Sequence, residues 1–163
     1  MTINVTISSS VGSDCNLTAF CTNGFANPIA ASSATQFTLH DTTTTDNIFS
    51  AHIDLIICGT GFTYDISGAL TAGTITEIQL KPTEVGSVVS TITGLSVDAA
   101  ALAAAALASD TSTVDALLFG AGSFNYTGDV GPDIFPGGIK NDVMNGGAGK
   151  DTIGDRRGNA TIT

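Results

Sequence analysis

The segment FGAGSFNYT-GDVGPDIFP-GGIKNDVMN-GGAGKDTIG-DRRGNATIT, from Phe119 to Thr163, consists of five consecutive blocks of nine residues. The fourth block fits the pattern G-G-x-G-x-D-x-U-x, in which U is a large apolar residue, at every specified position. The second and third blocks each depart from it once, at Asp129 and Lys140, where glycine is expected. A nine-residue period with glycine, aspartate and an apolar residue at fixed offsets is typical of a parallel β-roll that binds calcium. The alternative is a Gly/Asp-rich loop without repeat geometry.

The residue types of each block suit a calcium site. Glycine permits a tightly curled backbone whose carbonyl oxygens point to one spot, and aspartate adds the hard anionic oxygen that Ca²⁺ prefers. One turn of such a roll uses two blocks, so sites form between blocks that are two apart. We therefore expect Asp133 and Asp151 to share a calcium ion. The expected carbonyl ligands come from the glycines of the same two blocks: Gly128, Gly131, Gly146, Gly147 and Gly149.

The remaining blocks predict a weaker second site and a cap. Asp142 of the third block should face the fifth block, where Ala160 replaces the carboxylate. That site is expected to be half formed. The first block carries Phe124 at the carboxylate position and resembles the atypical terminal repeat that closes a repeat array.

The segment from Gly128 to Thr163 resembles the haemolysin-type calcium-binding repeats of secreted RTX proteins, and GGAGKDTIG is the strongest match. Upstream, the stretch from GTGFTYDISGAL to DALLFG is similar to the β-domain often found before such repeats in large secreted bacterial proteins. The resemblance implies export by a one-step route, folding triggered by external calcium, and a surface, matrix or toxin context. Members of that family usually lack cysteine, whereas this chain has three cysteines.

The hydrophobic pattern predicts a mainly β protein in three parts. Turn signals about ten residues apart indicate a β-sandwich or barrel-like domain over residues 1–94, with turns or short strands over residues 8–33. A short α-helical pair over residues 95–120 should be packed on it, with Ser96 capping the first helix. Residues 121–163 would form the parallel β-roll of nonapeptide repeats.

Composition excludes several classes of function. The formal net charge is −10 and the chain has only five Lys and Arg residues, so no basic patch is available to bind nucleic acid. No run of 18 apolar residues indicates a membrane span, and no cleavable signal peptide is visible at the N-terminus. An acidic, calcium-binding chain suits a secreted, extracellular or cell-surface location, where millimolar Ca²⁺ fills weak sites.

Catalytic motifs are not recognisable, so we expect a protein that is not an enzyme. The sequence has no H-E-x-x-H, no G-x-S-x-G and no P-loop. His40 and Tyr64 are the candidate ligands of a less favoured haem-carrier hypothesis. The cysteines leave three possibilities open: a Cys15–Cys21 disulfide, buried free thiols, or a zinc site.

The leading hypothesis is a secreted, calcium-stabilised structural or adhesive protein that assembles with itself into a surface layer, filament or extracellular matrix. The alternating segment TINVTI, residues 2–7, would pair either within its own domain or with the sheet of a neighbouring copy. The alternative is a repeat-bearing module of a larger secreted enzyme or toxin, whose chemistry lies elsewhere.

Overall fold

The structure is a computed structural model that describes residues 1–8, 13–14, 17–42, 52–83, 85–120, 122–154 and 156–163. The helices of this part are α1 (Leu17–Phe25), α2 (Ala99–Leu107) and α3 (Thr111–Phe119). Its strands are β1 (Thr2–Ile7), β2 (Ser13–Asp14), β3 (Gln36–Asp41), β4 (Ile53–Tyr64), β5 (Leu70–Pro82), β6 (Ser90–Asp98), β7 (Ser123–Thr127), β8 (Asp133–Phe135), β9 (Val143–Asn145), β10 (Thr152–Ile153) and β11 (Thr161–Ile162). The prediction of a mainly β protein is confirmed.

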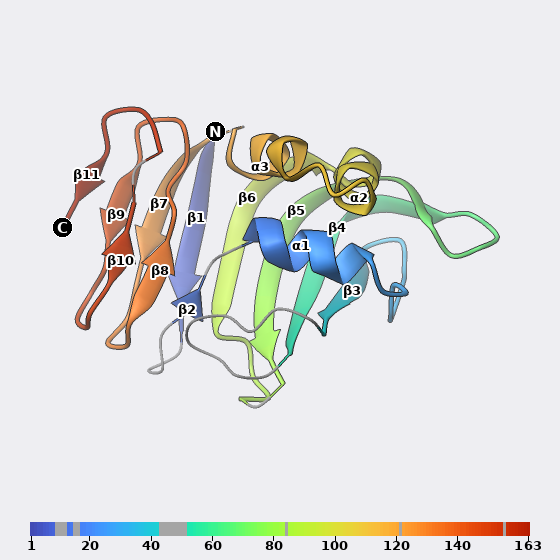
Figure 1. The fold of residues 1–163 in the computed structure, drawn as a ribbon, viewed down its shortest axis with the longest axis horizontal. Helices are drawn as coiled ribbons and strands as arrows, with labels where there is room; N and C mark the ends of the chain where they lie inside the picture. Colours follow the sequence, from blue (N-terminus) through green and yellow to red (C-terminus); the bar gives the residue numbers. More distant parts are fainter. Residues whose placement is uncertain (9–12, 15–16, 43–51, 84, 121, 155) are drawn as a thin grey trace.

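One large mixed sheet runs through the molecule in the order β11-β9-β7-β1-β6-β5-β4-β3, and a small sheet has the order β10-β8-β2. Strand β1 lies inside the large sheet, antiparallel to β6 on one side and parallel to β7 on the other (Figure 1). The segment TINVTI therefore pairs within its own chain, which is one of the two pairings expected for it. The sheet runs without a break from the N-terminal part into the repeat segment.

The predicted N-terminal β-sandwich or barrel is wrong for the described residues. Strands β1, β6, β5, β4 and β3 form a single antiparallel arrangement, and the three helices cover one face of it (Figure 1). The reason is visible in β1, where Ile3, Val5 and Ile7 are buried and the residues between them are exposed. Such a strand needs a hydrophobic layer on one face only, and helices supply that layer as well as a second sheet does.

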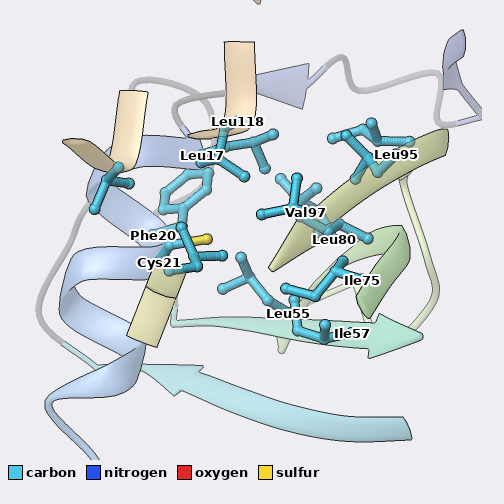
Figure 2. Packing of buried hydrophobic residues seen from close by; sticks show 14 of the residues in the cluster. Leu17, Phe20, Cys21, Leu55, Ile57, Ile75, Leu80, Leu95, Val97 and Leu118 are labelled. Carbon is cyan, nitrogen blue, oxygen red and sulfur yellow. The ribbon is translucent and has the colours of Figure 1, made fainter. Parts of the chain in front are cut away.

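Helix α1 was not expected, because residues 8–33 were predicted to form turns or short strands. Its buried residues are spaced as on one helical face and are Leu17, Phe20, Cys21, Gly24 and Phe25. Threonine, asparagine and glycine within LTAFCTNGF have low helix propensity and obscure this period. Leu17, Phe20 and Cys21 point into the core toward side chains of the sheet (Figure 2).

The predicted helical pair is present as α2 and α3, with one shift at the start. Asp98, and not Ser96, caps α2, because its side chain accepts a hydrogen bond from the N–H of Ala101 (2.9 Å). Ser96 and Val97 still belong to β6. Gly120 follows the last residue of α3 as expected. Within the described part of the chain, no helix has the length and apolar character needed to cross a membrane.

The strands of the repeat segment pair in parallel at a constant offset. Asn125 of β7 pairs with Val143 of β9, and Val143 pairs with Thr161 of β11, which are steps of 18 residues (143 − 125 and 161 − 143). In the small sheet, Ile134 of β8 pairs with Thr152 of β10 at the same offset. Eighteen residues are two blocks of nine. Tyr126, Phe135 and Met144, the U residues of three blocks, are fully buried.

The interior position of β1 makes its side chains sensitive to truncation. Ile3 is fully buried and pairs with Phe124 of β7. We expect Ile3→Ala to lower the free energy of unfolding by about 2–5 kcal/mol, because it leaves a cavity at the seam between the N-terminal strands and the repeats. Thr6→Ala on the exposed face of β1 is the control and should change it by less than about 0.5 kcal/mol. Urea unfolding followed by circular dichroism measures both, and equal effects would show that the seam is not packed as described.

Candidate metal centre

Asp133 and Asp151, the expected carboxylate pair, lie next to each other. Asp133 is fully buried at the start of β8, and Asp151 directly precedes β10, which pairs with β8. The N–H of Asp133 donates a hydrogen bond to Asp151 Oδ1 (3.1 Å). The N–H of Asp129 in turn donates to Asp133 Oδ2 (3.1 Å). The carboxylates of blocks two and four are thus linked through main-chain amides.

Glycines of these two blocks leave room for the oxygen atoms around the pair. An added Cβ at Gly146 would lie 2.5 Å from Asp151 Oδ2, and one at Gly128 would overlap Asp133 Oδ2 and the carbonyl oxygen of Gly146. Gly149 has a φ of 142°, and a side chain there would overlap the carbonyl oxygen of Gly131. Only glycine combines this backbone conformation with this closeness. Glycine at these positions therefore lets the main chain of blocks two and four lie close to both carboxylates.

Asp129, which the repeat pattern marks only as a departure from glycine, belongs to the same cluster. Its carbonyl oxygen accepts a hydrogen bond from the N–H of Ala148 in block four (2.8 Å), and its Oδ1 accepts one from the N–H of Gly131 (2.7 Å). Its Oδ2 is buried and has no hydrogen-bond partner. A buried carboxylate oxygen without a partner is unfavourable, and a cation relieves that cost.

These observations fit a hard cation bound mainly by main-chain oxygens. Among the described residues, no group of three or more His, Cys, Asp or Glu side chains is arranged to hold a metal ion by itself. Calcium takes six to eight oxygen ligands and accepts backbone carbonyls together with carboxylates. Main-chain carbonyl oxygens near Gly128 and Gly149, together with the unpartnered Asp129 Oδ2, are oxygen donors of this kind. A zinc site of cysteine and histidine side chains has no counterpart in this part of the chain.

Asp142 is placed differently from the expectation of a site shared with block five. Its Oδ1 accepts a hydrogen bond from the N–H of Phe124 and its Oδ2 one from the N–H of Gly138, both at 2.8 Å. The carboxylate therefore reaches toward block one, as Asp151 reaches toward Asp133, and it is 1% exposed. Block five contacts Asp142 through the main chain, because the N–H of Thr161 donates to its carbonyl oxygen (2.8 Å). Protein amides already satisfy both carboxylate oxygens.

His40 and Tyr64, the candidate haem ligands, do not converge. His40 Nδ1 lies 2.6 Å from Asp54 Oδ1, and these residues pair across β3 and β4. Tyr64 ends β4 ten residues after Asp54, which corresponds to about 30 Å along a strand, and its hydroxyl donates to the carbonyl oxygen of Ser33 (3.1 Å). The two side chains cannot bind opposite faces of one haem.

The cysteines of the described residues are free thiols. Burial raises the pKa of the Cys21 thiol to about 12, and Cys21 lies in the core. Cys58, on β4, has a pKa raised by burial and by the neighbouring Glu77 carboxylate. Cys15, the expected disulfide partner of Cys21, lies outside the described residues.

No protein-family model, no curated protein and no solved structure matches this chain. The functional argument therefore rests on the repeat pattern and on the geometry around Asp133 and Asp151.

The position of Asp142 predicts a structural role that does not need calcium. Asp142→Ala removes two charge-assisted hydrogen bonds and leaves two buried amides without an acceptor, so the free energy of unfolding should fall by about 3 kcal/mol or more. The loss should be equal in EDTA and in calcium. Asp142→Asn, which keeps one acceptor oxygen, should lose less. Urea unfolding in both buffers measures the effect, and a loss seen only with calcium would instead identify Asp142 as a metal ligand.

Proposed function

We propose that this chain is a secreted, calcium-binding structural or adhesive protein whose C-terminal repeats, of the RTX type, form a β-roll that calcium orders. The observation that carries the proposal is the link between the Asp133 amide and the Asp151 carboxylate, two blocks apart and surrounded by glycines. In this proposal residues 1–94 are a β-rich domain, residues 95–120 a helical connector, and residues 121–163 the calcium-binding roll.

Calcium would act as a folding ligand. Asp129, Asp133 and Asp151 bring like charges together at one end of the small sheet, and a calcium ion bound there would offset most of this negative charge. An ion that binds only the folded roll shifts the equilibrium toward it by mass action. Extracellular calcium is concentrated enough to fill even a weak site.

Order in the roll would stabilise the rest of the chain. Strand β7 is hydrogen-bonded to β1, so the roll continues the N-terminal sheet. Arg156 of block five pairs with Asp115 of α3, and Asp115 also accepts a hydrogen bond from Thr18 of α1. The guanidinium of Arg156 lies over the ring of Phe119, 4.6 Å from its centroid. These contacts tie the last repeat to the helical layer.

The outer edge of the roll supports self-assembly. In the large sheet, β11 is an edge strand that pairs with β9 and with no other described strand. Ile162 of β11 is 50% exposed, although its register partner Met144 is fully buried. An edge strand with a half-exposed apolar residue suits addition of another strand, here from a second copy of the chain.

The alternative proposal, a repeat-bearing module of a larger secreted enzyme or toxin, draws on the same edge. Further nonapeptide repeats would continue the sheet beyond β11 at the same offset of 18 residues. The mass of the native protein discriminates between the two proposals. If the polypeptide from its natural source has a mass well above 16.4 kDa under denaturing conditions, the larger protein is favoured.

Calcium should raise the melting temperature, and the pair of aspartates should be required for this effect. At roughly one hundred times its Kd, calcium stabilises the folded state by about 2.7 kcal/mol, which corresponds to a rise of roughly 5–10 °C. Asp151→Ala should lose most of this rise, because one anionic ligand is removed. Differential scanning calorimetry in calcium and in EDTA measures the effect. An equal melting temperature of the wild type in both buffers contradicts calcium binding.

Assembly through β11 should be blocked by a charge at its exposed apolar position. We expect Ile162→Lys to remain folded and to abolish the oligomers that the wild type forms in calcium, because a lysine on an edge strand opposes strand addition. Ile66→Lys, at a fully exposed position between β4 and β5, is the matched control. Light scattering after gel filtration and electron microscopy measure oligomer size. Oligomers unchanged in Ile162→Lys would exclude this edge.

A further inference from the structure

We infer that Asp129 supplies a third side-chain oxygen to the calcium ion proposed between blocks two and four, together with Asp133 and Asp151. The inference rests on the proposed function, and it concerns a residue that the repeat pattern does not use as a ligand. In the pattern this position is glycine, and here it is aspartate.

The first argument is position. The main chain of Asp129 contacts the loop of block four directly, because its carbonyl oxygen accepts the N–H of Ala148 and because a side chain at Gly147 would overlap that same oxygen. Its N–H donates to Asp133 Oδ2, the oxygen that also lies against Gly128. Asp129 therefore sits where the loops of blocks two and four meet, beside the predicted ligands.

The second argument is the state of its two carboxylate oxygens. Oδ1 is used by the N–H of Gly131, which fixes the orientation of the side chain. Oδ2 is shielded from solvent and has no partner. Among the described residues no basic side chain pairs with Asp129 or with Asp151, because the ion pairs of this part involve Asp54 and Asp115. A buried carboxylate oxygen without a donor or a cation is the group that a divalent ion would satisfy.

The third argument comes from comparing Asp129 with Asp142. Both oxygens of Asp142 accept main-chain amides, so that carboxylate has no further need of a cation. Asp129 has one oxygen left over. Of these two aspartates, the protein itself satisfies both side-chain oxygens of Asp142 but only one of Asp129, and Asp129 lies beside the Asp133–Asp151 pair.

The inference requires a movement. Because no three acidic side chains in the described part of the chain are arranged to hold a metal by themselves, calcium would have to draw Asp129 Oδ2 and the pair closer together. The site should then bind one ion per chain with three carboxylates, and its affinity should depend on that number of charges.

Isothermal titration calorimetry of the full chain with calcium chloride tests this. The variants are Asp129→Gly, which restores the residue of the pattern, and Asp129→Asn, which keeps an acceptor for the Gly131 amide. We expect both to weaken the calcium affinity, Asp129→Gly by about tenfold or more, with one ion bound per chain in the wild type. Glu77→Gln is the control for charge, because it removes one carboxylate on β5, which β6 and β1 separate from β7, and it should bind as the wild type does.

The outcomes separate the inference from the proposed function. If the wild type binds calcium and both Asp129 variants bind it with unchanged affinity, the inference is overturned and the proposed function stands. If the wild type shows no binding, the proposed function is overturned and the inference with it. Circular dichroism in EDTA verifies that each variant has the wild-type fold before titration, so that a weaker affinity reports the lost ligand. If Asp129→Gly does not fold, the Asp129→Asn titration decides the question.

Discussion

The double pairing of β1 is the constraint on which the architecture depends. A strand in the interior of a sheet must have both rows of main-chain groups satisfied, and β1 does this with β6 on one side and β7 on the other. The pairing with β6 is antiparallel and the pairing with β7 is parallel, so β1 is where the sheet changes from one type to the other. Without β1, the N-terminal strands and the repeats would each expose a sheet edge toward the other.

A continuous aromatic cluster packs helix α3 against the repeats and joins strand β7 of the large sheet to strand β8 of the small sheet. The rings of Phe119 and Phe124 lie 5.6 Å apart, Phe124 and Phe135 lie 5.4 Å apart, and Phe135 is stacked on Tyr126 at 4.6 Å. Phe119 ends α3. Tyr126 of β7 and Phe135 of β8 are buried where the repeat strands of the large sheet face those of the small sheet. The helical layer and the repeats therefore share one hydrophobic core. Asp133 begins β8, the strand that carries Phe135, so the calcium binding that we propose there would act directly next to this core.

The parts of the fold that could be predicted are those with a strict period. The nine-residue blocks of the sequence correspond to the strand offset of 18 residues, and the alternation of TINVTI corresponds to the burial of Ile3, Val5 and Ile7. A strict period fixes which residues face the same way. It does not reveal what covers them, and for that reason a second sheet was expected where helices lie. Helix α1 was missed because threonine, asparagine and glycine interrupt its apolar spacing.

The same limit applies to the candidate site, where the repeat period predicts which residues come together but not how their side chains point. That Asp133 and Asp151 lie next to each other follows from counting blocks, because strands two blocks apart are neighbours. The direction in which each carboxylate points depends on the curl of its own loop, and block counting alone placed Asp142 toward block five. Asp129 was set aside because it breaks the pattern, and its buried, unpartnered oxygen is visible only in three dimensions. A deviation from a repeat is thus informative when the structure shows what the deviating side chain lacks.

The position of β1 also determines when the sheet can close. Asn4 contacts Asn125, a residue 121 positions later in the chain. Strand β1 therefore cannot complete its pairing until the long segment that separates it from β7 has been synthesised. Contacts of such high sequence separation slow folding, because the entropy of closing a long loop is lost before the contact is gained. The large sheet of this chain therefore stays open at β1 until β7 has emerged and docked.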